Sequence, residues 1–327
     1  MRFVSRSPGA RASARLCSVA LALSVALSGG AAHALTLFST DGTSPGGPSD
    51  SDIFSPGGIG GPPVTAISDG ALGIEVPGTV ELDAMTFGAP AVTMFFSVDR
   101  SSVGVPGAPP DVFSEAAVGQ AAADVYTTGL GGTNILFINQ DVLGLLPPIP
   151  AGVPAVPPID NLDALDLAQI GPVPMATPVP PGALTEPLFS LTSGNAFGVS
   201  GADLLGPGTP TTGPPPVVIG FAALGLVAAD DVDALHFDAL TGMIFFSLKA
   251  GSPSLGAGTC GGFSAADVFF SAGGGACALF APAAALGLLS TDEVDAIAFV
   301  PEPATALLLA AGLAALAVRR REGCSRG

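Results

Sequence analysis

Four aspartates recur at one position of a repeated motif and are the residues best placed to do chemistry. Asp83, Asp163, Asp233 and Asp295 each lie between an apolar residue and an alanine. If the repeats form a ring, these carboxylates occupy equivalent sites and suit calcium, which takes several oxygen ligands. Residues 230–231 and 290–293 add oxygen-bearing side chains beside two of them. The same position also fits a turn where each side chain accepts backbone N–H bonds, and both interpretations stay open.

No other residue pattern indicates catalysis. After removal of a leader the one histidine is His236, inside the strand-like segment 232–237, which fits neither a hydrolytic triad nor a zinc site. The sequence has no phosphate-binding loop, no dinucleotide fingerprint and no aspartic protease motif. We therefore expect no catalytic residues. A pair of carboxylates that hydrolyses polysaccharide is the alternative that so acidic a chain leaves open.

The aspartates belong to a larger repeat of four short motifs in a fixed order. An aromatic-Ser start is followed by an Asp-led apolar triplet, then by a Leu-Gly step, and then by the apolar-Asp-Ala-apolar element. We assign the triplet to Asp52-Ile53-Phe54, Asp111-Val112-Phe113, Asp203-Leu204-Leu205 and Asp267-Val268-Phe269. The four units span approximately residues 35–87, 92–168, 187–239 and 243–299. Pro-rich insertions lengthen the second unit.

Each unit offers about four short strand-like runs separated by Gly and Pro turns, which predicts an all-β fold. In the last unit these runs are residues 244–248, 267–271, 277–280 and 294–299, with a short helical turn in 282–289. Four strands per repeat favours a β-propeller, whose closed ring leaves few exposed sheet edges. The alternative is a β-sandwich or a pair of them.

The charge distribution separates the two ends from a body at residues 35–299. The body holds 25 of the 27 acidic residues but only two basic ones, Arg100 and Lys249, for a net charge of −23. Such a surface repels nucleic acid and anionic lipid. The body also keeps two cysteines, Cys260 and Cys277, which we expect to pair outside the cytoplasm.

Residues 1–34 have the order of parts of a secretory signal peptide. Four arginines without any acidic residue precede the apolar run 16–27, and Ala32-His33-Ala34 fits the small-x-small cleavage pattern. The alternative, a buried N-terminal helix, conflicts with the basic start and with Gly29-Gly30. We expect cleavage before Leu35.

The C-terminal residues 300–327 form a second three-part signal. Pro301-Glu302-Pro303 precedes an uncharged apolar stretch, residues 304–318, predicted to be a transmembrane helix, and then the basic cluster Arg319, Arg320 and Arg321. This order resembles the PEP-CTERM sorting signal of Gram-negative bacteria. The resemblance implies recognition and cleavage by an exosortase, and association with exopolysaccharide or biofilm. An ordinary C-terminal membrane anchor is the alternative.

These features together predict an exported protein at the cell surface or in the extracellular matrix, held in the inner membrane by its C-terminal helix until it is processed. We expect a non-enzymatic structural or interaction module without a cofactor. Its partners would be an exosortase and, through the sorting signal, exopolysaccharide or other matrix proteins, but not nucleic acid. A secreted polysaccharide hydrolase and a calcium-dependent adhesin are the alternatives.

Overall fold

The computed structural model describes residues 35–41, 51–58, 61–74, 81–87, 93–107, 109–145, 161–167, 187–208, 215–238, 241–256, 260 and 263–300. The predicted signal peptide with Ala32 and Ala34, the sorting motif 301–303, the helix 304–318 and Arg319–Arg321 lie outside these residues. Within the described residues, no helix is both long enough and apolar enough to cross a membrane.

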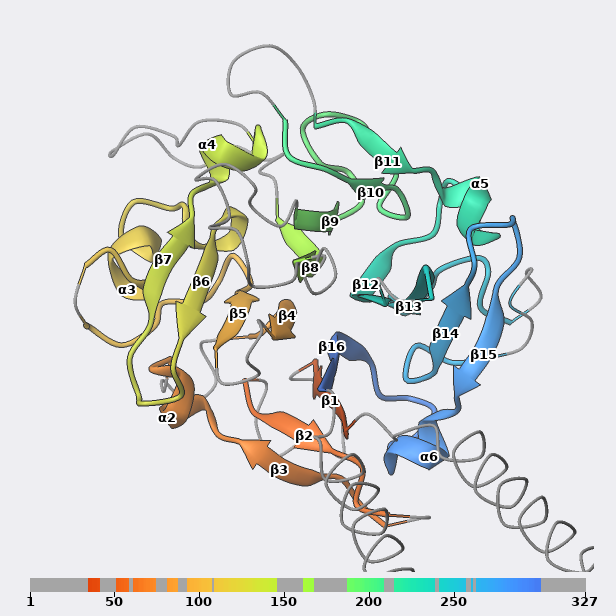
Figure 1. Cartoon of the computed structure of the whole chain (residues 1–327), viewed down its shortest axis with the longest axis horizontal. Helices are drawn as coiled ribbons and strands as arrows, with labels where there is room; N and C mark the ends of the chain where they lie inside the picture. Colours follow the sequence, from red (N-terminus) through yellow and green to blue (C-terminus); the bar gives the residue numbers. More distant parts are fainter. Residues whose placement is uncertain are drawn as a thin grey trace, which may run out of the picture. The chain divides into compact units, whose positions relative to one another are not determined.

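Residues 36–300 form a ring of four antiparallel, four-stranded sheets (Figure 1). The first sheet has the order β16-β1-β2-β3, so the last strand of the chain pairs with the first one. Its strands are β16 (Val294–Val300), β1 (Leu35–Thr40), β2 (Ile53–Ser55) and β3 (Val64–Ile67). The four sheets are the blades of a β-propeller, which confirms the expected fold and excludes the β-sandwich.

The other three blades each use four strands that follow one another in the sequence. The second blade contains β4 (Ala84–Phe87), β5 (Met94–Ser97), β6 (Val125–Thr128) and β7 (Ile135–Ile138). The third contains β8 (Leu162–Leu167), β9 (Pro187–Leu191), β10 (Leu204–Leu205) and β11 (Val217–Ile219). The fourth contains β12 (Val232–Asp238), β13 (Met243–Leu248), β14 (Val268–Ser271) and β15 (Ala278–Ala281).

The motif with the repeated aspartate begins the innermost strand of each blade. These strands, β4, β8, β12 and β16, contact one another in sequence around the axis (Figure 1). Each sequence unit therefore ends on the first strand of the next blade, and units and blades are out of phase by one strand. The offset makes every unit bridge two blades.

A separate apolar core fills each junction between neighbouring blades. At β4, Met85 and the preceding Leu82 pack into the core shared with the first blade, whereas Ala84 packs into the core shared with the third blade. The other inner strands divide their residues in the same way. The large apolar residues of the motif thus fill one junction, and its alanine allows close packing at the next.

A short helix follows the outer strand of each blade. These are α2 (Asp69–Leu72), α4 (Gln140–Leu143), α5 (Phe221–Leu224) and α6 (Ala283–Leu286). The Gly of each Leu-Gly step ends its helix with a left-handed backbone, as at Gly73 with φ of 74°. Such a backbone favours glycine, which explains why this step repeats.

One triplet assignment is wrong. Asp111-Val112-Phe113 begins the additional helix α3 (Val112–Ala116), where Asp111 forms a capping box with Ser114. The strand equivalent is Asp124-Val125-Tyr126, which leads into β6 after the 3-10 helix η1 (Ala121–Ala123). The insertion that contains α3 and η1 has the same residue pattern as the triplet. At this place the pattern starts a helix and not a strand.

The repeated serines connect neighbouring blades. The Oγ of Ser39, on β1, donates to the carbonyl oxygen of Leu82 at 3.1 Å, next to the repeated Asp83. Ser190 and Ser247 donate to the carbonyl oxygens of Val232 and Val294 in the same way, at 2.9 and 2.6 Å. Ser97 departs from this pattern and donates to Ala122. The aromatic-Ser motif thus fixes the strand that carries the next repeated aspartate.

We expect Ser190→Ala and Ser247→Ala each to lower the free energy of unfolding by about 1–3 kcal/mol, because each leaves a buried carbonyl without its donor. Urea denaturation followed by circular dichroism measures the change. Ser290→Ala is the matched control, since Ser290 is exposed. If all three variants had the same free energy of unfolding as the wild type, these hydrogen bonds would not contribute to the stability of the blade junctions.

Candidate functional site

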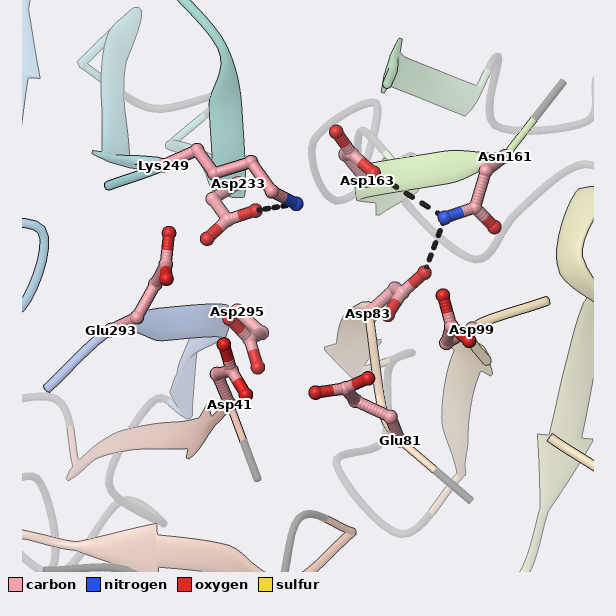
Figure 2. A pocket seen from close by; sticks show the side chains of 10 residues that line it. All are labelled: Asp41, Glu81, Asp83, Asp99, Asn161, Asp163, Asp233, Lys249, Glu293 and Asp295. Atoms are coloured by element: carbon pink, nitrogen blue, oxygen red, sulfur yellow. Dashed lines mark hydrogen bonds and ion pairs between the residues drawn. The ribbon is translucent and has the colours of Figure 1, made fainter. Parts of the chain in front are cut away.

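The four repeated aspartates meet in an acidic pocket at the centre of the ring. Figure 2 shows their side chains, which come from different blades, pointing toward a common space. The cavity has a volume of about 100 Å³. Eight carboxylates, one amide and one ammonium group line it, from Asp41, Glu81, Asp83, Asp99, Asn161, Asp163, Asp233, Lys249, Glu293 and Asp295.

The lining follows a grid of three positions per blade. Each inner strand contributes the repeated aspartate and the residue two positions before it. The next strand contributes the residue two positions after the repeated serine. Reading these three positions in blade order gives Glu293-Asp295-Asp41, Glu81-Asp83-Asp99, Asn161-Asp163-Thr192 and Asp231-Asp233-Lys249. All of them except Asp231 and Thr192 line the pocket.

A β-bulge directs two of the repeated aspartates, Asp163 and Asp233, toward the axis. Leu162 and Ala164 pair with consecutive residues of β9, so Asp163 is an extra residue in its strand. Asp233 is the extra residue between Val232 and Ala234 in the same way. A bulge bends a strand and changes the direction of a side chain. This explains how a charged residue can lie between two buried apolar ones and still reach the pocket.

Two sets of repeated aspartates have different surroundings. Asp52, Asp124, Asp203 and Asp267, which precede the third strands, each accept the backbone N–H of the first residue of the blade's short helix at 2.6–3.0 Å. By contrast, no backbone N–H among the described residues donates to Asp83, Asp163, Asp233 or Asp295. The turn role that the sequence suggests for the second set is therefore found in the first.

Three side chains of the third and fourth blades make polar contacts with the repeated aspartates. Asn161 donates its Nδ2 to Asp83 at 2.8 Å and to Asp163 at 3.5 Å (Figure 2). Thr192 donates to Asp163 at 2.5 Å. The Nζ of Lys249 lies 3.5 Å from Asp233. The Oδ2 atoms of Asp163, Asp233 and Asp295 are buried and accept no hydrogen bond from the described residues.

The crowding of carboxylates raises their pKa values. Burial is the main cause at Asp163, whose pKa rises to about 7 although Lys249 lowers it. Burial and neighbouring carboxylates raise the pKa values of Asp83, Asp233 and Asp295 well above the ordinary range. Burial alone would lower the pKa of Lys249, but the carboxylates beside it, chiefly Asp233, raise it. The ammonium group of Lys249 therefore remains charged. Several of the carboxylates, by contrast, are stabilised when they bind a proton or a cation.

Oxygen ligands for a metal ion are grouped in one blade. One carboxylate oxygen from each of Glu81, Asp83 and Asp99 lies within 4.8 Å of the others. The sequence singles out Asp83 but not Glu81 or Asp99. The signal that would have found them is the position two residues before each repeated aspartate and two after each repeated serine, because alternate residues of a strand share a face.

The remaining residues singled out in the sequence lie apart from the pocket lining. The Nδ1 of His236 is 3.0 Å from Asp166, and its ring packs against Phe299 and Phe245. Cys260 and Cys277 form a disulfide that closes a loop with a sequence separation of 17 residues. These groups belong to the structure of the third and fourth blades.

The raised pKa values predict that the metal-free protein loses stability as the pH rises. An acid with a higher pKa in the folded state stabilises that state below its unfolded pKa, and this stabilisation is lost as the pH rises through the folded pKa. For Asp163 this interval runs from about 3.8 to about 7. In a chelator we expect a melting temperature roughly 5 °C higher at pH 5 than at pH 8. Asp295→Asn should flatten this dependence, whereas Ser290→Ala should not, and equal slopes in all three proteins would contradict the assignment.

Comparison with known proteins identifies the C-terminal segment. No curated protein matches the chain. Residues 299–321 match the family model of the PEP-CTERM protein-sorting motif, and this segment contains Pro301-Glu302-Pro303 and the three arginines. The match implies export and sorting by an exosortase at the cell envelope. The chain thus carries a PEP-CTERM sorting motif, which begins within the last two residues of its last described strand, β16.

Proposed function

We propose that the propeller is a non-enzymatic structural or interaction module of the extracellular matrix, associated with exopolysaccharide or with other matrix proteins. The observation that carries the proposal is the sorting motif at residues 299–321, because such motifs direct exported proteins to the surface. In this proposal residues 304–318 hold the protein in the inner membrane until the exosortase cleaves the tail.

The charge of the body supports an extracellular task. With a net charge of −23 over residues 35–299, the body repels nucleic acid and anionic lipid surfaces. The same charge favours solubility and the binding of cations that bridge acidic polymers. Contacts with neutral sugars or with other proteins would use the outer surface of the blades.

The acidic pocket is the feature that favours the second candidate, a polysaccharide hydrolase. Clustered buried carboxylates, one of them with a pKa of about 7, are what glycoside hydrolysis requires. The volume of the cavity argues against this reaction, because about 100 Å³ is well below the roughly 300–1,000 Å³ of pockets that enclose ligands. A sugar ring flanked by its neighbours would not fit between the inner strands.

Replacement of Pro301-Glu302-Pro303 by three alanines tests the sorting proposal. We expect the wild-type protein to be released as a species that lacks residues 304–327, and the variant to remain uncleaved in the membrane fraction. Intact-mass spectrometry of both fractions gives the ends of each species. Alanines at Pro147 and Pro148, in the Pro-rich insertion, are the matched control. A released wild-type protein that retains residues 304–321 would overturn processing at the motif.

Incubation of the purified protein with the producing organism's exopolysaccharide separates the module from the hydrolase. We expect the polysaccharide to cosediment with the protein while no new reducing ends form, both with the wild type and with Asp163→Asn. Reducing ends released by the wild type and lost in Asp163→Asn would establish the hydrolase instead.

A further inference from the structure

The charge of the pocket residues differs from blade to blade, although each blade contributes the same three positions of the repeat. Two blades combine the repeated aspartate with neutral or basic groups, in Asn161-Asp163-Thr192 and Asp231-Asp233-Lys249. The other two present carboxylates at all three positions, in Glu81-Asp83-Asp99 and Glu293-Asp295-Asp41. One side of the pocket is therefore partly neutralised by the chain itself, and the other side holds six acids.

On the neutralised side the aspartates have protein partners. Asp163 accepts hydrogen bonds from Thr192 and Asn161, and Asp233 forms an ion pair with Lys249. The ammonium group also lies near enough to Asp163 and Asp231 for their charges to raise its pKa. Lys249 thus acts as a built-in cation for this side.

On the acidic side a buried carboxylate lacks such a partner. Asp295 is 8% exposed, lines the pocket, and its Oδ2 accepts no hydrogen bond from the described residues. Asp233, Asp83, Glu81 and Asp41 are the carboxylates whose charges act on it. A buried charge without compensation is costly, so a cation beside Asp295 would stabilise the acidic side.

We propose that the acidic side of the axial pocket binds one calcium ion, with Glu81, Asp83 and Asp99 as its protein ligands and Asp295 as the facing buried carboxylate. Two ligand oxygens on opposite sides of calcium are about 4.8 Å apart, since each lies 2.3–2.6 Å from the ion. The three carboxylate oxygens of Glu81, Asp83 and Asp99 fall within that separation.

The ligand chemistry favours calcium over other cations. All the groups are carboxylates, which select hard ions, and no described histidine or cysteine lines the pocket. The ligands come from two segments, one directly before β4 and one directly after β5, which gives an irregular set rather than an octahedron. Calcium accepts such geometry and retains water ligands, whereas magnesium demands near-ideal octahedral coordination. The cavity of about 100 Å³ has room for an ion with bound water.

Isothermal titration of the chelator-treated, full-length protein with calcium chloride tests the site. We expect one calcium ion per chain, with a Kd on the order of 10⁻⁴ M or tighter, and a higher melting temperature in calcium than in chelator. Absence of binding at millimolar calcium, or several weak ions per chain without any stabilisation, would overturn the proposal.

Two isosteric variants locate the ion. Asp83→Asn should weaken calcium binding by about tenfold or more, yet raise the melting temperature in chelator because it removes one of the repelling charges. Asp233→Asn is the matched control: it occupies the same position of the repeat, beside Lys249, and should lose less calcium affinity than Asp83→Asn. Equal losses in both variants would overturn the placement on the acidic side. If Asp83→Asn does not fold, Asp99→Asn replaces it, with the same expected result.

Lys249→Gln tests the division of the pocket. Without the ammonium group Asp233 loses its ion-pair partner, so we expect a lower melting temperature in chelator and a second calcium ion in the titration. An unchanged stoichiometry together with an unchanged melting temperature would show that Lys249 does not act as the built-in cation.

Discussion

The pairing of β16 with β1 is the contact on which the rest of the structure depends. It joins the last described strand to the first and turns four separate sheets into a ring (Figure 1). Without it the first blade would lose its inner strand, and Asp295 would leave the pocket. The predicted signal cleavage precedes Leu35, where β1 begins, and the sorting motif Pro301-Glu302-Pro303 follows Val300, where β16 ends. Removal of both signals would therefore leave the closing pair intact.

The repeat made much of the fold predictable from the sequence. The predictions that failed did so for physical reasons. Strands such as β13 and β14 follow from apolar runs between Gly turns, and the hairpin joining β12 to β13 follows from Thr241-Gly242. The triplet at Asp111 was misread because the same letters also start a helix, in which Asp111 and Ser114 cap each other. The phase of the blades was missed because strand order depends on ring closure, which no local pattern encodes.

The site was predictable in part. The recurrence of Asp83 and its three equivalents is visible in the sequence, but their direction depends on bulges at positions such as Asp163 and Asp233. Strict alternation would place Val232 and Ala234 on one face and direct Asp233 into the junction core on the other, whereas in the structure Val232 and Ala234 pack into different cores. The sequence does not mark Glu81, Asp99 and Lys249 as pocket residues, because the residue types at their positions differ from blade to blade and only the grid of positions shows that they are equivalent.

The differences among equivalent positions follow from the electrostatics of a closed ring. A repeat that placed three acids per blade at the axis would bring twelve carboxylates around a cavity of about 100 Å³. Such a site has three means of lowering its energy: replacing acids, binding protons, or binding a cation. Thr192, Asn161 and Lys249 represent the first, and the raised pKa of Asp163 represents the second. Burial and neighbouring carboxylates favour proton binding at Asp83 and Asp295 too, but a proton neutralises one carboxylate without linking the blades. A cation on the remaining acidic side would instead attract the inner strands of two blades to one point, next to the strand that closes the ring.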